Sequence, residues 1–217
     1  MALTLHGYRY SVYTRIARMV LHSQATTYTY VEVNPFADPP DPGLARVTRL
    51  GLVPVLDHDG FVLCETGAIT RYLCAIDPDA ALRPAGAKAQ ARMDQVISVI
   101  DAYGYWPMVR QVFAHAVFRP LIGAEADQDV IADGLRAAGP VLAQLNDIAA
   151  EGRVLDPAAP TLADMHLAPM MAYFMAAPQA ATALADHPAL AGWWARAQHM
   201  PALLATDPGL ATLTSQA

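Results

Sequence analysis

In the first 78 residues, short apolar segments typical of strands alternate with amphipathic segments typical of helices. Leu3 and Leu5 alternate with polar neighbours, and residues 28–33 are mostly aromatic or β-branched, so a strand is predicted at each place. Between them, residues 12–24 carry apolar side chains at helical spacing. A strand, a helix and a second strand in this order predict a parallel strand pair.

The same alternation continues to Pro78. The remaining periodicity predicts a short helix at residues 44–50, strands at 53–56 and 61–64, and a helix at 65–76. Asp59 and Gly60, a pair typical of tight hairpin turns, lie between the last two strands, which are therefore predicted to be antiparallel. Pro78 is expected to end the last helix. The N-terminal part is therefore predicted to have the order βαβαββα.

After Pro78 the pattern changes, because every later apolar segment has helical spacing. A polar linker at residues 79–87 is followed by predicted helices at 88–118, 127–150, 161–177 and 188–200. The first helix is expected to bend at Trp106 and Pro107, since proline removes one hydrogen bond of the helix. Alanine, the strongest helix former, occurs 7 times in residues 1–78 and 36 times in residues 79–217. We therefore expect an α/β domain at 1–78 and an all-helical domain at 88–217.

Composition and charge exclude several classes of protein. Charged residues make up 16% and hydrophobic residues 54%, which excludes an intrinsically disordered chain. The net charge of −6 argues against a nucleic-acid partner. No uncharged apolar run reaches the ~18 residues that a membrane-spanning helix requires, so no membrane association is expected. The spacing of Cys64 and Cys74 fits neither a disulfide framework nor a metal site, and a reducing, cytoplasmic setting is expected.

Four short motifs lie at the junctions between these predicted elements. They are Ser11 at the start of the first helix, Val53-Pro54 before the third strand, Glu65-Thr66 at the start of the third helix, and Thr161 with Asp164 at the start of a later helix. In order and spacing they resemble the cytosolic glutathione S-transferases, in particular bacterial members with a serine-type active site. The resemblance covers essentially the whole chain. It implies a thioredoxin-like N-terminal domain that binds glutathione and an all-α helical-bundle domain that lines the acceptor-substrate pocket.

Ser11 is the candidate catalytic residue. The resemblance implies that a hydroxyl here, or a tyrosine slightly earlier, holds the glutathione sulfur. A free thiol has a pKa of about 8.5 and is only about 3% thiolate at pH 7, so a hydroxyl donor and a helix N-terminus would favour the reactive anion. Tyr8, Tyr10 and Tyr13 are alternatives for this role, and a simple helix N-cap is the structural alternative for Ser11. Thioredoxin-like disulfide exchange is excluded, because Ser11 and Thr14 occupy the two positions of a Cys-x-x-Cys pair.

The resemblance also implies that Val53, Pro54, Glu65 and Thr66 bind glutathione. A cis peptide bond before Pro54 would turn the Val53 backbone toward the extended tripeptide, and an ordinary trans proline is the alternative. Glu65 would pair with the γ-glutamyl amine and Thr66 with its carboxylate, unless both residues only cap the helix. Leu52 stands where the family often has a polar or basic residue, which leaves open weak glutathione binding or another thiol cosubstrate.

Apolar and aromatic residues near Ser11 and in the first helix of the helical domain are candidates for the acceptor pocket. They are Tyr10, Tyr13, Tyr105, Trp106 and Val109, and a place in the core is the alternative for the last three. The predicted function is glutathione transfer to an apolar electrophile. The alternatives are a non-catalytic binding or regulatory protein on the same scaffold, and a glutathione-dependent isomerase or lyase. The resemblance further implies a homodimer, glutathione as cosubstrate and no metal, whereas Thr161 and Asp164 are expected to cap a helix.

Overall fold

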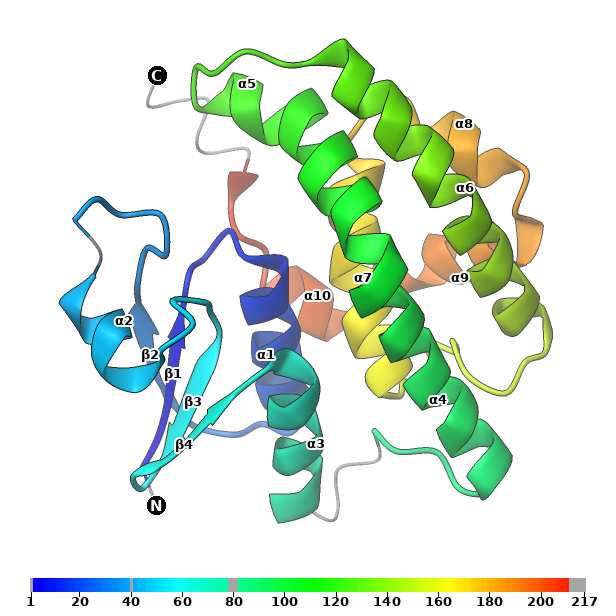
Figure 1. Cartoon of the computed structure of the whole chain (residues 1–217). Helices are drawn as coiled ribbons and strands as arrows, with labels where there is room; N and C mark the ends of the chain where they lie inside the picture. Colours follow the sequence, from blue (N-terminus) through cyan, green and yellow to red (C-terminus); the bar gives the residue numbers. More distant parts are fainter. Residues whose placement is uncertain (1, 40, 78–81, 211–217) are drawn as a thin grey trace. The chain divides into compact units, whose positions relative to one another are not determined.

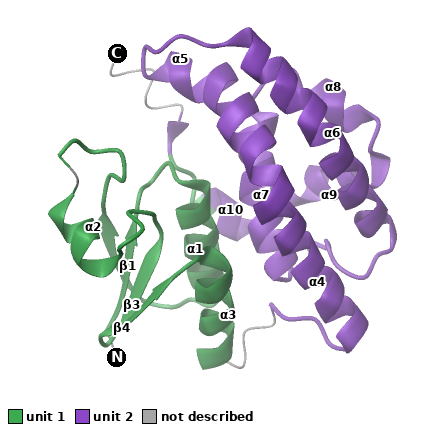
Figure 2. Ribbon diagram, viewed as in Figure 1, with its two compact units in different colours: residues 1–80, 205–208 green, residues 81–204, 209–217 purple. Residues whose placement is uncertain are grey.

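The chain divides into two compact units. The structure, a computed structural model, describes residues 2–39, 41–77 and 82–210 (Figure 1). Unit 1 comprises residues 1–80 with 205–208, and unit 2 comprises residues 81–204 with 209–217 (Figure 2). The predicted helix end at Pro78, the start of the predicted linker and the last seven residues of the predicted helical domain lie outside the described residues.

One segment groups differently from the sequence-based boundary. We expected all of residues 88–217 to form the helical domain, but residues 205–208 belong to unit 1. Thr206 and Pro208 are buried there. The short length of this segment explains the difference, because four residues carry no periodicity that could assign them to a unit.

Unit 1 is a four-stranded mixed sheet with helices on both faces. Its elements are β1 (Leu3–Gly7), α1 (Val12–Ser23), β2 (Thr29–Glu32), α2 (Pro42–Val47), β3 (Val55–His58), β4 (Phe61–Cys64) and α3 (Thr66–Ile76). The strand order is β2-β1-β3-β4, in which β1 and β2 are parallel and the other neighbouring pairs are antiparallel. The predicted thioredoxin-like order, with its parallel pair and its hairpin, is therefore confirmed.

The two faces of this sheet have separate cores. Figure 1 shows α1 and α3 on one face and α2 on the other. On the first face, α1 buries Ile16 and Val20 completely. On the second face, Leu44 of α2 forms a cluster with Val33 and Val55. Along β1, buried residues alternate with partly exposed ones, because successive strand residues point to opposite faces.

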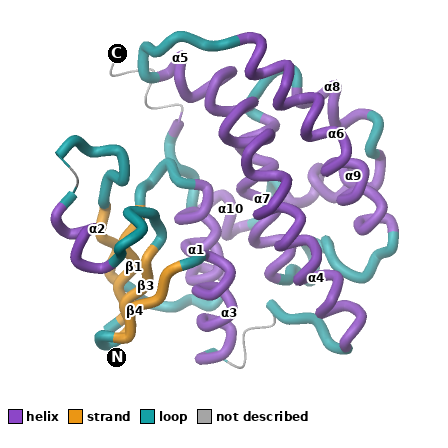
Figure 3. Tube along the Cα trace, in the orientation of Figure 1, coloured by secondary structure: helices purple, strands orange, loops and turns teal. Residues whose placement is uncertain are grey.

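All regular structure in the described part of unit 2 is helical (Figure 3). Its elements are α4 (Ala87–Val99), η1 (Ile100–Gly104), η2 (Trp106–Phe118), α5 (Arg119–Leu121), α6 (Gln128–Ala150), α7 (Leu162–Met175), α8 (Ala180–Ala185), α9 (Pro188–Ala197) and α10 (Pro201–Ala205). The segments from α4 to α5 follow one another without a loop, so the long helix predicted at 88–118 is present. The helices predicted at 127–150, 161–177 and 188–200 are also present, whereas α8 and α10 were not predicted.

Within the long helix, the backbone is π-helical in η1 and again in η2. The backbone N–H of Tyr105 donates to the carbonyl of Ile100, and that of Arg119 donates to the carbonyl of Ala114, five residues back in each case. An α-helix uses a spacing of four. Pro107, which has no N–H to donate, lies at the start of η2. At the place where we predicted a bend, the structure therefore has a wider helical turn.

Two short helices begin at proline residues that sequence reasoning used differently. We predicted a helix at 44–50, but α2 begins at Pro42, because the Asp41 side chain accepts hydrogen bonds from the N–H groups of Gly43 and Leu44. The helix predicted at 188–200 ends at Ala197, and a separate short helix, α10, opens at Pro201. Proline fits the first helical turn, where its missing N–H has no partner to lose.

Helix α7 begins with a buried capping box. The N–H and the hydroxyl of Thr161 donate to Oδ2 of Asp164 at 2.8 and 3.1 Å, and the indole N–H of Trp193 donates to Oδ1 at 2.9 Å. Asp164 is fully buried, and this burial raises the pKa of its carboxyl, while the hydrogen bonds act in the opposite direction. The predicted capping role is confirmed, and Trp193 adds a link between α9 and α7.

Helices α6 and η2 approach closely at Gly134. A Cβ atom at this position would lie 2.8 Å from Cβ of Gln111, 2.9 Å from Cγ2 of Val112 and 3.0 Å from the carbonyl oxygen of Pro107. Because two of these atoms belong to the backbone or lie next to it, they cannot move aside as the end of a flexible side chain can. Gly134 therefore sets the separation of the two helices.

We expect the substitution Asp164→Ala to lower the free energy of unfolding by roughly 3 kcal/mol, from a lost cap of about 1 kcal/mol and from buried donors left unpaired. Urea unfolding followed by tryptophan fluorescence measures this value. Asp133→Ala is the control, because Asp133 is exposed and pairs with Arg136 on the same helix, so its loss should cost under about 0.5 kcal/mol. Equal costs for the two variants would contradict a central role of Asp164.

Two glycine substitutions should have opposite effects on stability. Gly134→Ala should lower the free energy of unfolding by about 1–3 kcal/mol, because the added methyl overpacks the contact with η2. Gly192→Ala, at a site in α9 with no atom within 4 Å of the added Cβ, should raise it by about 0.5–1 kcal/mol through helix propensity. The same urea titration measures both, and a shift of both variants in one direction would refute the packing argument.

Candidate functional site

The strand register brings three of the predicted motifs to one end of the sheet of unit 1. His6, near the C-terminal end of β1, pairs with Val55, the first residue of β3, and Val55 pairs in turn with Cys64, the last residue of β4. The loop that leads to Ser11, the Val53-Pro54 pair and the start of α3 therefore all leave the sheet at this end. We call this region, which comprises Ser11, Val53, Pro54, Glu65 and Thr66, the sheet-end site.

Ser11 is the N-cap of α1. Its backbone is extended, and its Oγ accepts a hydrogen bond of 3.3 Å from the N–H of Thr14. The first turn of α1 contains no acidic side chain, so the positive end of the helix is not neutralised locally. The N-cap interpretation is thus correct, but it does not exclude the catalytic one. The bond from Thr14 uses an acceptor site of Oγ, whereas a thiolate ligand would use its O–H donor.

The three rival tyrosines lie around Ser11 in the sequence and are all half-buried. The ring of Tyr8 packs edge-to-face against Tyr10 at 5.4 Å and against Phe36 at 5.9 Å, measured between ring centroids. Burial, and to a lesser degree the nearby Tyr10 and Glu32, raise the pKa of Tyr8. Tyr8 therefore stays a neutral hydrogen-bond donor at ordinary pH. Tyr13 lies in the first turn of α1.

Two side chains that sequence reasoning did not assign to the site hold the loop before Ser11. The hydroxyl oxygen of Thr14 accepts the N–H of Tyr8 at 3.3 Å. On the other side, the Glu32 carboxylate accepts the N–H of Arg9 at 2.9 Å and the hydroxyl of Tyr30 at 2.8 Å. The sequence could have indicated Glu32, because it ends β2 and the carboxyl ends of parallel strands meet at one edge of the sheet.

The Val53–Pro54 peptide bond is cis, as the resemblance implied. The hydrogen-bonded ladder of the sheet begins only at Val55, so the backbone of Val53 lies outside it. The side chain of Val53 packs against the cluster around Leu44. Leu52 is 62% exposed, and its apolar side chain offers a ligand neither a hydrogen bond nor a charge.

Glu65 occupies a backbone conformation that residues other than glycine rarely adopt. Its φ is 69° and its ψ is 117°, and such strain costs on the order of 1–3 kcal/mol. Its side chain is not hydrogen-bonded to the start of α3, so Glu65 does not cap the helix as the structural alternative required. Thr66, the first residue of α3, is buried, and no acidic side chain lies in the first turn. Acidic charge at the start of this helix therefore comes from the N-cap residue Glu65 and not from the first turn.

The predicted acceptor-pocket residues are divided between the two units. Tyr10 and Tyr13 belong to unit 1, whereas Tyr105, Trp106 and Val109 belong to unit 2. Trp106 is 62% exposed and Tyr105 is half-buried, but Val109 is buried. The pocket itself stays a prediction.

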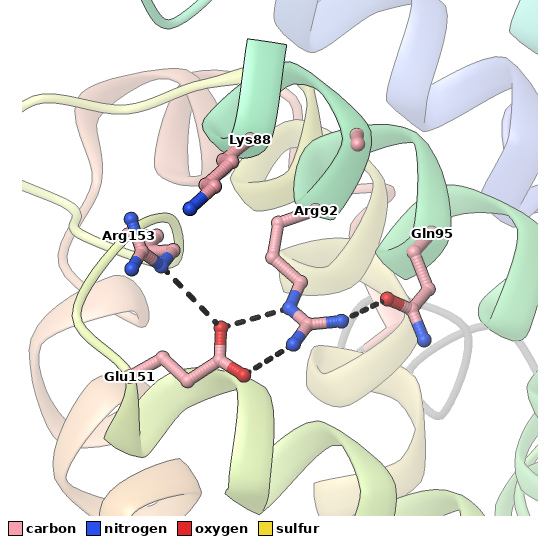
Figure 4. Close-up of a pocket in the computed structure, with 6 residues that line it drawn as sticks. Lys88, Arg92, Gln95, Glu151 and Arg153 are labelled. Carbon is pink, nitrogen blue, oxygen red and sulfur yellow. Dashed lines mark hydrogen bonds and ion pairs between the residues drawn. The ribbon is translucent and has the colours of Figure 1, made fainter. Parts of the chain in front are cut away.

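A shallow pocket of ≈ 550 Å³ lies in unit 2, between α4 and the end of α6 (Figure 4). The Arg92 guanidinium donates two hydrogen bonds to the Glu151 carboxylate and one to Gln95, and Arg153 lies 3.9 Å from the same carboxylate. Hydrogen bonding between Arg92 and Glu151 raises the pKa of Arg92 and lowers that of Glu151. Because these groups satisfy one another, we interpret the cluster as a brace between α4 and α6.

Cys64 and Cys74 are not joined in a disulfide bond. Over residues 2–39, 41–77 and 82–210, no group of three or more His, Cys, Asp or Glu side chains is placed to hold a metal ion. None of the helices in the described ranges combines the length and hydrophobicity needed to span a lipid bilayer.

Comparison with known proteins shows that the chain is similar to glutathione S-transferases. Residues 5–81 match the family model for the N-terminal domain of glutathione S-transferases. Over 97% of both chains, the sequence is 28% identical to glutathione S-transferase F13 of Arabidopsis thaliana. Among solved structures, glutathione transferase F7 of Populus trichocarpa is 25% identical with a TM-score of 0.80, covering 98% of this chain and 99% of that one. The theta-class glutathione S-transferase of Xanthomonas axonopodis pv. citri, solved with glutathione bound, is 26% identical with a TM-score of 0.78, covering 94% and 96%. The matching relatives include plant and bacterial proteins and extend over both units, and the match to the family's N-terminal domain covers residues 5–81.

Proposed function

We propose that the protein is a glutathione S-transferase that activates the thiol of glutathione for attack on an apolar electrophile. The observation that carries this proposal is the hydroxyl of Ser11 at the open N-terminus of α1, on the same end of the sheet as Val53 and the start of α3. The whole-length similarity to glutathione S-transferases supports it. The serine-type mechanism is part of the proposal.

Ser11 and the start of α1 could together supply the free energy that stabilisation of the thiolate requires. Lowering a thiol pKa by about two units requires about 2.7 kcal/mol of preference for the anion. A hydrogen bond from a hydroxyl to an anion supplies on the order of 1.5–3 kcal/mol, and a helix N-terminus adds up to about 1 kcal/mol. Ser11 and the first turn of α1 offer both. The thiol gives its proton to solvent water. With an aryl chloride, the sulfur then forms a C–S bond to the ring carbon, the C–Cl bond breaks, and chloride leaves with the electron pair of that bond.

Glutathione would bind along the sheet end in an extended form. The Val53 backbone, which is outside the strand ladder, would pair with the peptide in the manner of an added strand. Glu65 would receive the γ-glutamyl amine, and the Thr66 hydroxyl with the first N–H groups of α3 would receive its carboxylate. The exposed Leu52 adds no polar contact, so the affinity for glutathione rests on the other residues.

Three further features belong to the same proposal. Aromatic side chains are candidates for contact with the electrophile, namely Tyr10 and Tyr13 in unit 1 and, separately, Tyr105 and Trp106 in unit 2. A homodimer would cover exposed apolar residues such as Tyr103, which is 68% accessible in the single chain. A cytoplasmic location agrees with two free thiols.

We expect Ser11→Ala to lower turnover with glutathione and an activated aryl chloride at least about tenfold at pH 6.5, because the thiolate loses a hydrogen-bond donor. Conjugate formation followed by absorbance measures the rate, and circular dichroism checks the fold. Ser98→Ala is the control, because the exposed Ser98 hydroxyl donates only to the carbonyl of Asp94. Unchanged turnover of Ser11→Ala would move the thiol-binding role to Tyr8, Tyr10 or Tyr13.

Glu65→Gln should raise the KM for glutathione about tenfold and change kcat much less, because a charge-assisted contact with the substrate amine becomes neutral. Initial rates over a range of glutathione concentrations measure both constants. Glu125→Gln, in the loop between α5 and α6, makes the same chemical change away from the site and should leave both unchanged. A folded wild-type protein that is not retained on immobilised glutathione would instead favour a non-catalytic role.

A further inference from the structure

Thr14 is a completely buried polar residue in the first turn of α1. Its side chain points back toward the end of β1, where its Oγ1 accepts the N–H of Tyr8 at 3.3 Å. A methyl group of the same size would fill the space equally well, so packing alone does not explain a hydroxyl at this place. The hydroxyl instead ties the first turn of the helix to the loop that precedes it.

Ser11 is held from two sides by groups that depend on Thr14. The backbone N–H of Ser11 donates to the carbonyl of Tyr8 at 2.8 Å, and Tyr8 is the residue whose N–H the Thr14 hydroxyl accepts. The backbone N–H of Thr14 itself donates to Oγ of Ser11 at 3.3 Å. One residue therefore positions both the backbone and the hydroxyl of Ser11.

The end of β1 is shaped to receive the Thr14 side chain. A Cβ atom at Gly7 would lie only 2.3 Å from Cγ2 of Thr14 and 3.1 Å from its Oγ1. Any side chain at Gly7 would therefore displace Thr14 from its contact with Tyr8. Gly7 and Thr14 form a matched pair across the junction between strand and helix.

We propose that Thr14 is a positioning residue that aims the Ser11 hydroxyl at the bound thiolate. The N–H of Thr14 occupies an acceptor site of Ser11 Oγ, which leaves the O–H of Ser11 to donate elsewhere. The Thr14 hydroxyl keeps this geometry by fixing the loop through Tyr8. This inference rests on the proposed function, and it assigns to Thr14 a role that its sequence position alone does not suggest.

Two substitutions distinguish the hydrogen bond of the Thr14 hydroxyl from the space that the side chain fills. Thr14→Val keeps the volume and removes the acceptor for the N–H of Tyr8, whereas Thr14→Ser keeps the acceptor and removes the methyl group. At pH 6.5 we expect Thr14→Val to lower turnover about fivefold, the size of one lost neutral hydrogen bond, and Thr14→Ser to stay within about twofold of wild type. Thr29→Val is the control, because it makes the same change at an exposed position of β2.

The pH profile distinguishes positioning from a general loss of stability. If Thr14→Val weakens the stabilisation of the thiolate, the apparent pKa of kcat/KM for the electrophile, measured at saturating glutathione, rises. The rate loss then shrinks above that pKa, because the thiol ionises without help. The ionisable groups near Ser11, on its loop, on α1, on β2 and before α3, are Tyr8, Arg9, Tyr10, Tyr13, Arg15, Glu32 and Glu65. Neither variant alters them. A less stable but correctly arranged site would lose rate equally at all pH values.

A direct readout does not depend on activity. Amide hydrogen exchange followed by NMR should be faster at Tyr8 in Thr14→Val than in wild type, and nearly unchanged in Thr14→Ser. Unchanged exchange at Tyr8, or equal pH profiles of wild type and Thr14→Val, would overturn the positioning role. An inactive wild type with faster exchange in Thr14→Val would refute the proposed function alone, because the structural link would then still hold.

Discussion

The antiparallel pairing of β3 with both β1 and β4 is the constraint on which the sheet-end site depends. Because His6 faces Val55 and Val55 faces Cys64, the end of β1, the start of β3 and the end of β4 must coincide. Every motif that leaves the sheet there is thereby brought to the same end of the sheet. A slip of one residue would turn each strand's buried side chains outward, so the cores on both faces of the sheet protect the site's register.

Two helix N-termini in this chain use the same capping chemistry with different consequences. At α7, the Asp164 carboxylate is buried and accepts hydrogen bonds from Thr161 and Trp193, so it has a purely structural role. At α1, the cap residue Ser11 is half-exposed, and the bond from Thr14 uses only an acceptor site of its hydroxyl. Burial and saturation of hydrogen bonds, rather than residue type, distinguish a cap that only stabilises from one that can also bind a ligand.

Segments with clear periodicity were predictable, whereas short helices that begin at a proline were not. The strands β1 and β4 and the helices α1, α3, α6 and α7 lie where the apolar pattern placed them. Helices α2 and α10 begin at Pro42 and Pro201, and proline can open a helix as readily as end one, so the residue type alone was ambiguous. The π-helical hydrogen bonds around Pro107 have no counterpart in the spacing of apolar residues. The positions of the site motifs followed from a family resemblance, whereas Thr14 and Glu32 were missed, because their contacts join separate turns and strands.

Features that depend on neighbouring residues could be predicted from the sequence alone. Periodicity, helix caps and turn residues act over a few neighbouring positions, so the order of elements, the Thr161–Asp164 cap and the hairpin at Asp59 and Gly60 were already visible. Only the tertiary structure determined three features: the direction in which the Ser11 hydroxyl can donate, the burial of Asp164 against Trp193, and the hydrogen bonds that hold the loop before Ser11. These features depend on residues far apart in sequence, and only the packing of the core determines which of them meet.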